Sequence, residues 1–163
     1  MELWDILDKD RNKTGKLIER GQHLKTGEYH LVVFAFIKNS KGELLISKRT
    51  PNKTYPNTWE ITGGAAVTGD TSLTAIIREA KEELGINLEI DKGKIIKSFR
   101  CDVNHSYFAD VWLFEQDINF DNIVCQPEEV SEAALVTKEE LIALIKNNMF
   151  IQNDYVLECL ELL

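Results

Sequence analysis

The segment from residue 63 to residue 86 constrains this chain most, because glycines bound an acidic helix there. Gly63-Gly64 precede the helix and interrupt the chain, and Gly85 after it predicts a left-handed helix cap. Asp70 is placed to cap the first turn. One face of the predicted helix is apolar at helical spacing and would pack on a sheet: Leu73, Ile76, Ile77, Ala80 and Leu84.

Three carboxylates share a second stripe of the same helix. Glu79, Glu82 and Glu83 lie at i, i+3 and i+4, so their side chains are neighbours. In water such pairs repel by only ~0.2–0.5 kcal/mol, and a solvated acidic face would tolerate them. Two partly buried charges ~6 Å apart cost ~3 kcal/mol, which favours a bound cation. Oxygen ligands indicate Mg²⁺ or Mn²⁺, and carbonyl groups of the preceding glycine loop are able to approach the same ion.

The acidic balance of the chain separates two classes of phosphate-containing partner. The 163 residues carry 19 Lys and Arg against 27 Asp and Glu, and 19 − 27 gives −8. This charge disfavours a nucleic acid polymer, which needs a basic surface, but allows a small phosphorylated substrate bridged by a divalent cation. Cys101, Cys125 and Cys159 form no paired pattern, and no signal peptide or membrane-spanning stretch is apparent. We therefore expect a cytoplasmic protein that does not bind membranes.

Short strand patterns mixed with a few helical ones predict an α/β layered domain. No repeat, low-complexity tract or linker divides the sequence, so residues 1–163 are expected to form a single domain. Strands are expected at residues 3–7, 16–20, 31–37, 43–48, 95–103, 107–115 and 130–136, with further helices at residues 138–146 and 154–162.

The acidic segment also resembles a known family signature. Gly64, five residues, Asp70, seven residues and then the run from Arg78 to Ile86 are similar to the Nudix box, GX5EX7REUXEEXGU with U apolar. Asp70 stands where the family usually has Glu, at a position that mainly supports the loop. The resemblance implies a Nudix fold, an α/β/α sandwich with a mixed central sheet. It also implies a hydrolase that cleaves the pyrophosphate of a nucleoside diphosphate linked to another moiety.

The resemblance assigns roles to residues of the box. Mg²⁺ or Mn²⁺ would be held by Glu79, Glu82 and Glu83, together with the Gly63 carbonyl. Arg78 would orient the carboxylates by salt bridging, including the pair with Glu82 at i+4. The cation would lower the pKa of a bound water, whose proton a carboxylate accepts. The implied partner is a small nucleotide-containing diphosphate, and the protein is expected to be a monomer or a homodimer.

Residues outside the box supply further candidates. Glu129, with Glu128 beside it, follows Pro127 in a loop like those where many Nudix enzymes keep their general base. Lys48 and Arg49 are candidates for steering phosphate. A surface acidic turn also explains the glutamates, and a solvated strand end also explains the basic pair.

Three other segments are similar to the Nudix subgroup related to type I isopentenyl diphosphate isomerase. They lie at residues 4–8, 29–32 and 48–51. By this resemblance His30 and Asp110 would bind a metal ion. A hydrogen-bonded structural histidine explains His30 equally well.

The resemblance to the isomerase breaks at the segment before the box. The isomerase needs a cysteine there, and this chain has Thr62-Gly63-Gly64 with no cysteine nearby. Isomerase-like activity is therefore an alternative to hydrolysis. A catalytically silent nucleotide-binding Nudix domain is another, although such a domain has no physical need for the three glutamates.

Overall fold

The computed structural model describes residues 1–103, 105–151 and 154–163 of the chain. Two short 3₁₀ turns, Ile90–Lys92 and Phe120–Asn122, lie in the connections. The strands and α-helices of the described residues are, in chain order, β1 (Leu3–Leu7), β2 (Lys13–Glu19), β3 (His30–Lys38), β4 (Leu44–Arg49), β5 (Trp59–Glu60), β6 (Thr62–Ala65), α1 (Ser72–Leu84), β7 (Gly93–Cys101), β8 (Tyr107–Glu115), β9 (Val130–Val136), α2 (Lys138–Lys146) and α3 (Asp154–Leu160).

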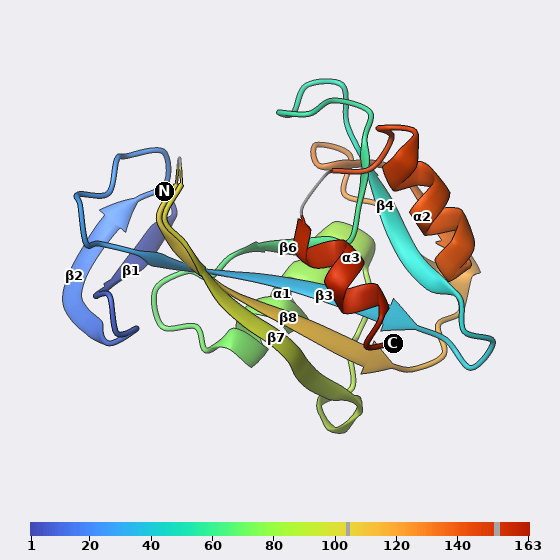
Figure 1. Cartoon of the computed structure of the whole chain (residues 1–163), viewed down its shortest axis with the longest axis horizontal. Helices are drawn as coiled ribbons and strands as arrows, with labels where there is room; N and C mark the ends of the chain where they lie inside the picture. Colours follow the sequence, from blue (N-terminus) through green and yellow to red (C-terminus); the bar gives the residue numbers. More distant parts are fainter. Residues whose placement is uncertain (104, 152–153) are drawn as a thin grey trace.

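Strands β3 to β9 form one mixed sheet around the central strand β3 (Figure 1). β3 runs parallel to β8 along its whole length, from the His30–Tyr107 pair to the Lys38–Glu115 pair, and antiparallel to β6. β3 and β4 pair at Lys38 and Leu44. β6 also pairs with β3, and β5 and β9 both pair with β4. The mixed sheet that the family resemblance implies is confirmed.

Helices cover both faces of this sheet. Alternate residues of β3 point to opposite faces, as the two-residue period of a strand requires. Val33 and Ala35 pack in a core with the apolar stripe of α1, including Ile76. Phe36 packs in a second core with residues of α2 and α3, including Val156. Figure 1 shows α1 behind the sheet and α3 in front of it, so the α/β/α sandwich is confirmed.

The predicted hairpin at the N-terminal end is confirmed as a separate two-stranded sheet, β1–β2. Its second strand begins at Lys13, three residues before the expected position. Backbone hydrogen bonds hold it to the rest of the chain: Leu7 and Tyr29 bond each other, and Thr68 donates to the Leu3 carbonyl at 2.8 Å. The hairpin thus lies against the loop that leads into α1.

The segment at residues 59–65 corrects the sequence analysis. We expected the glycine pair to interrupt the chain, whereas Gly63 and Gly64 lie within β6 and pair with Phe34 and Val33. The glycines allow close packing here and do not make a turn. No helix in the described part of the chain is long and apolar enough to cross a membrane.

Candidate active site

The helix α1 begins one residue later than the sequence predicts. Thr71 is the N-cap: its hydroxyl accepts the Thr74 N–H at 3.1 Å, and the Thr74 hydroxyl accepts the Thr71 N–H at 2.8 Å. The prediction of Asp70 as the cap was therefore wrong. The predicted C-terminal cap is confirmed, because Gly85 has φ of 70° in the left-handed region that glycine tolerates best.

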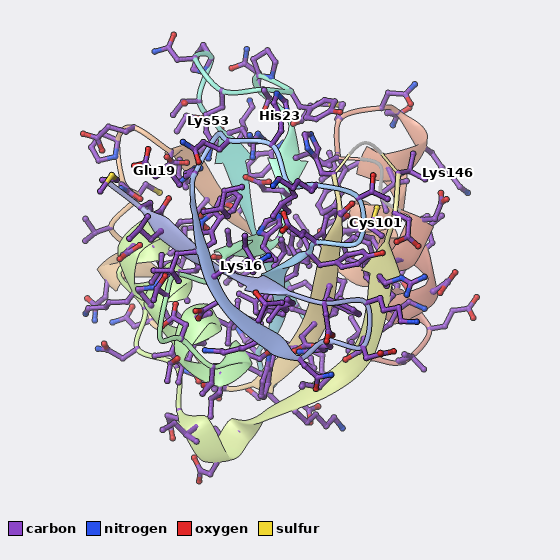
Figure 2. The ribbon with its side chains drawn as sticks, turned by 90° about the vertical axis from the view of Figure 1, so that its left-hand side faces the viewer. Lys16, Glu19, His23, Lys53, Cys101 and Lys146 are labelled. Atoms are coloured by element: carbon purple, nitrogen blue, oxygen red, sulfur yellow. The ribbon has the colours of Figure 1, made fainter. Side chains whose placement is uncertain are left out.

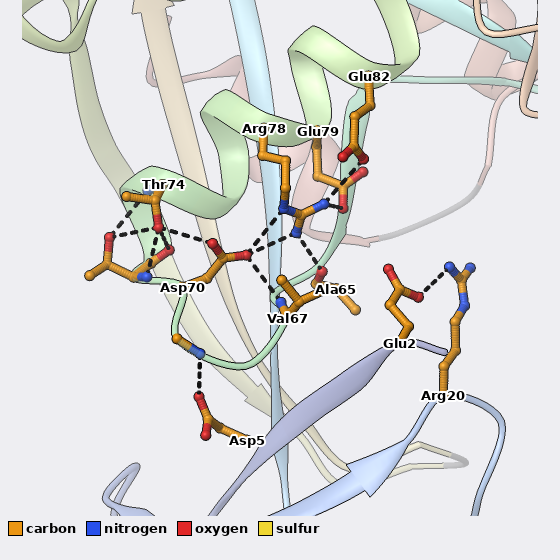
Figure 3. Close-up of polar contacts among 12 residues, drawn as sticks. Glu2, Asp5, Arg20, Ala65, Val67, Asp70, Thr74, Arg78, Glu79 and Glu82 are labelled. Carbon is orange, nitrogen blue, oxygen red and sulfur yellow. Dashed lines mark hydrogen bonds and ion pairs between the residues drawn. The ribbon is translucent and has the colours of Figure 1, made fainter.

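Arg78 is the centre of an ion-pair network on α1 (Figure 3). Its guanidinium lies 2.9 Å from Asp70, 3.0 Å from Glu79 and 3.2 Å from Glu82, which confirms the predicted i+4 pair. It also donates to the Ala65 carbonyl at 3.2 Å. Burial opposes its charge, but hydrogen bonding and attraction from Asp70 and Glu79 outweigh burial and raise the pKa of Arg78. Arg78 thus ties the end of β6 and the following loop to the carboxylates.

The Asp70 carboxylate, released from capping, supports this loop. Besides Arg78, it accepts the Val67 N–H at 3.1 Å and the Thr74 hydroxyl at 3.2 Å. The aspartate therefore reaches Arg78 despite being one methylene shorter than glutamate.

The three glutamates of the box differ sharply in environment. Glu83 is 7% exposed and accepts the Thr62 hydroxyl at 2.6 Å. Burial, with the negative charges of Glu60 and Glu79 nearby, raises the pKa of Glu83 to about 7 against the hydrogen bond from Thr62. Burial also raises the pKa of Glu79, although Arg78 opposes this. The Glu82 side chain is 53% exposed and lies at the rim.

These glutamates line a cleft of about 190 Å³ between α1, β6 and the hairpin. Counted by formal charge, five glutamates line it against one arginine and one lysine, and 2 − 5 gives −3. Such an excess in a partly buried site favours a bound cation. We call it the glutamate cleft; the described residues that line it are Glu2, Arg20, Lys53, Gly63, Gly64, Ala65, Glu79, Glu82, Glu83, Gln126 and Glu129.

Glycine is required at both positions of the β6 pair, for different reasons. A Cβ on Gly64 would lie 2.5 Å from the Glu79 carboxylate, because this carboxylate occupies the space that a side chain at position 64 would need. A Cβ on Gly63 would overlap the carbonyl oxygen of Val33 in the neighbouring strand. β6 therefore brings its backbone close to the glutamates of α1.

The residues of the cleft fit a hard divalent cation. Its donors are carboxylate oxygens with a backbone segment beside them, which is the ligand type that Mg²⁺ and Mn²⁺ take. Among the described residues no three acidic, histidine or cysteine side chains already surround one point. Arg78 pairs with both Glu79 and Glu82.

Glu129 lines the glutamate cleft, where its carboxylate pairs with Lys53. Its neighbour Glu128 is exposed and lies outside the described lining. Lys53 is partly buried, and burial with the charge of Arg49 lowers its pKa. The structure therefore brings Glu129 to the glutamates of the box and gives it a cationic partner that the sequence analysis missed.

The basic pair Lys48 and Arg49 makes its contacts outside the described lining of the glutamate cleft. Lys48 lies 3.8 Å from Glu132 and over the Trp59 ring at 5.6 Å. Arg49 binds Glu60 at 3.0 Å and lines a separate cavity of about 220 Å³ beside α3. Neither is among the described residues that line the cleft.

His30 and Asp110 also lie outside the described lining of the glutamate cleft. The His30 ring stacks on Trp4, with 4.2 Å between centroids and 6° between planes. Asp110 is fully buried, where Arg11 and Ser98 donate hydrogen bonds to its carboxylate at 2.8 and 2.6 Å. Its structural role is to fix the tip of the β1–β2 hairpin to β8.

Sequence reasoning missed the cleft residues that come from the hairpin. Glu2 and Arg20 pair at 2.8 Å across the ends of β1 and β2 (Figure 3). No motif marks either residue, and only the register of the hairpin places them beside the box. The sequence indicated Thr62 in part, because this residue directly precedes the glycine pair.

The family model for the NUDIX domain matches residues 28–158 of this chain. The chain belongs to the Nudix family. A Nudix hydrolase of Listeria monocytogenes is 41% identical over 153 residues, which cover 93% of this chain and 89% of the relative. An isopentenyl-diphosphate Delta-isomerase of Corynebacterium diphtheriae is 23% identical over 169 residues, covering 99% and 92%.

A solved structure shares the arrangement of nearly the whole chain. The crystal structure of the protein DR0079 from Deinococcus radiodurans matches with a TM-score of 0.77 and 30% identity, covering 98% of each chain. The family, the fold and the assignment as a hydrolase are thereby confirmed. Nudix hydrolases generally hydrolyse pyrophosphate bonds in small nucleotide-containing substrates and use divalent metals.

Proposed function

We propose that this Nudix hydrolase cleaves a phosphoanhydride bond in a nucleoside diphosphate-containing substrate with Mg²⁺, or Mn²⁺, held in the glutamate cleft. The observation that carries the proposal is that Glu79, Glu82 and Glu83 line one cleft together with two further glutamates. These carboxylates would repel a diphosphate alone, whereas a divalent cation held by them would bridge to the phosphate oxygens.

The residues of the cleft divide the work between them. Glu79, Glu82 and Glu83, with the Gly63 carbonyl, are the proposed ligands. When bound, the cation neutralises the pyrophosphate and makes a water more acidic. Arg78 orients Glu79 and Glu82 through the ion pairs at 3.0 and 3.2 Å.

Glu129 is the proposed acceptor of the water proton, because it lines the same cleft as the glutamates of α1 and is not among the proposed ligands. The Glu129 carboxylate pairs with Lys53, which lines the same cleft.

The cleft does not favour the isomerase alternative. Isomerisation of an alkene needs an acid on one face, and the position expected for a cysteine is Thr62 or a glycine beside it. The Thr62 hydroxyl is bonded to Glu83. The cysteines of the chain, Cys101, Cys125 and Cys159, are free and lie outside the described lining of the cleft.

We further propose that residues 1–163 act as one domain in the cytoplasm. The hairpin supplies Glu2 and Arg20 to the glutamate cleft, so the N-terminal strands and the box form one functional unit. The three free cysteines agree with a reducing compartment.

The test is a panel of nucleoside di- and triphosphates, nucleotide sugars and dinucleotides, with Mg²⁺ or Mn²⁺ and detection of released phosphate or nucleotide. We expect turnover of at least one compound, and a loss of at least about 100-fold in Glu83→Gln. Glu139→Gln, a change of an exposed glutamate in the first turn of α2, is the matched control and should keep full activity. Equal turnover in Glu83→Gln and wild type would refute the site, and silence of wild type toward the whole panel would favour a binding role.

A further inference from the structure

A second cavity, of about 420 Å³, adjoins the glutamate cleft on the hairpin side. Two observations place them side by side. Arg20 lines the cleft and the next residue, Gly21, lines the cavity. Ala65 of β6 lines the cleft, and its partner Val32 on β3 lines the cavity. Figure 2 faces this end of the molecule and labels His23 of the cavity and Lys53 of the cleft. A ligand with two linked parts is therefore able to occupy both.

The two sites have opposite chemistry. Seven of the described residues that line the cleft are acidic or basic, whereas none of those that line the cavity is Asp, Glu, Lys or Arg. All three histidines of the chain line the cavity. Burial keeps His30 neutral by lowering its pKa to about 4. The described lining consists of Trp4, Gly21, Gln22, His23, Leu24, His30, Val32, His105, Ser106 and Tyr107.

Aromatic rings form one wall of this cavity. Trp4 stacks on His30, and Tyr107 meets His30 edge-on at 6.2 Å and 67°. Trp4 and Tyr107 line the cavity and are only partly buried. Within the described part of the chain, Trp4 Nε1 and His30 Nδ1 are buried without a hydrogen-bond partner. Buried groups of this kind are rare in folded proteins and call for a partner.

We propose that the cavity binds the uncharged heteroaromatic ring, a nucleobase, of the substrate whose phosphates lie in the glutamate cleft. The proposal rests on the proposed function, because it assigns the second part of the same substrate. Trp4 and Tyr107 supply stacking surface, and Gln22, His23 and Ser106 supply donors and acceptors for the edge of the ring. The cavity volume lies within the range of ordinary small-molecule sites.

Other moieties suit the cavity less well. A second phosphate or a sugar acid needs a cation, and no lysine or arginine is among the described lining residues. An aliphatic chain would leave the polar side chains of Gln22, His23 and Ser106 without partners. A nucleobase has a ring face that stacks on the aromatic side chains and a polar edge that bonds to the polar side chains.

The first experiment uses the tryptophan side chains as reporters of position. In ¹H–¹⁵N spectra of the ¹⁵N-labelled full chain, the Trp4 indole N–H signal is assigned with Trp4→Phe. We expect it to shift on titration with adenosine, guanosine, cytidine or uridine, without metal. The Trp112 indole, which donates to Ser72 at 3.0 Å beside α1, should stay in place as the internal control. No response of Trp4 to any nucleoside, or an equal response to isopentenyl diphosphate, would overturn the proposal.

The second experiment separates binding of the base from catalysis. With the nucleotide substrate found by the panel, Trp4→Leu should raise KM about tenfold with kcat nearly unchanged, and Trp4→Phe should stay near wild type. His23→Ala, in an exposed loop, should raise KM without affecting folding. A fall in kcat at unchanged KM would overturn the base assignment. Nucleoside binding without hydrolysis of any compound would refute the proposed function alone, while hydrolysis with no Trp4 response would refute the base cavity alone.

Discussion

Replacing Gly64 by alanine tests how tightly β6 is fitted to the glutamates. The added Cβ would lie 2.5 Å from the Cδ and Oε1 atoms of Glu79, and an ordinary contact begins at 3.4 Å. The carboxylate must therefore withdraw by about 1 Å, several times the ~0.2 Å tolerance of a metal–ligand distance. A misplacement of ~1 Å in an active site costs about 100-fold in rate, which is the loss we expect in kcat for Gly64→Ala.

The fold should tolerate the same change, because the clash is with the flexible end of a side chain. We expect the free energy of unfolding of Gly64→Ala, from urea titration, to stay within about 1 kcal/mol of wild type. Gly63→Ala is the matched comparison: its Cβ meets the Val33 carbonyl, so the strand itself must shift and stability should fall by about 1–3 kcal/mol. Wild-type kcat in Gly64→Ala would refute the reasoning, as would a stability loss as large as that of Gly63→Ala.

Three further predictions concern residues around the site. Burial lowers the pKa of His30 from 6.5 to about 4, so as the pH drops the imidazole takes up a proton in the unfolded chain before it does so in the folded protein. The free energy of unfolding, measured by urea titration, should therefore fall by about 2 kcal/mol between pH 7 and pH 5. His30→Gln should remove this part of the loss. Arg11→Met should lower the free energy of unfolding by about 3 kcal/mol or more in the same assay, because it leaves the buried Asp110 carboxylate without its cationic partner. Adding Asp110→Asn should recover most of that loss. A loss below about 1 kcal/mol in Arg11→Met would contradict this. Asp70→Ala should lower the free energy of unfolding by about 1–2 kcal/mol, because it loses the bonds to Arg78 and to the Val67 N–H. Asp70→Glu should be as stable as wild type. Equal stability of all three proteins would contradict a role of Asp70 in supporting the loop.

Local patterns in the sequence were sufficient for most of the fold. The period of α1, the β-branched run of β3 and the hairpin near the N-terminus all emerge close to where the sequence predicts them, although α1 begins one residue later and β2 three residues earlier. The failures occur where a distant partner decides. Judged from the local sequence alone, Gly63-Gly64 predict an interruption of the chain. In the structure they pair with Val33 and Phe34 of β3 and are part of β6. Asp70 is a good cap by composition, but Arg78, eight residues on, binds its carboxylate and leaves Thr71 to cap the helix.

The candidate site follows the same division. The helical spacing of Glu79, Glu82 and Glu83 is a local property, and the structure keeps all three on one cleft. Glu2 and Arg20 join that cleft only through the pairing of β1 with β2, which sequence spacing does not encode.

The central claim, that the glutamates of α1 hold a divalent cation, is tested most directly by titrating the protein with Mn²⁺ and counting free ion by electron paramagnetic resonance. Glu82→Gln/Glu83→Gln is compared with wild type and with Glu139→Gln. We predict saturable binding to wild type and to Glu139→Gln, and affinity at least about tenfold weaker in the double variant, whose urea midpoint should show that it is folded. Equal Mn²⁺ affinity in the folded double variant and in wild type would contradict the account.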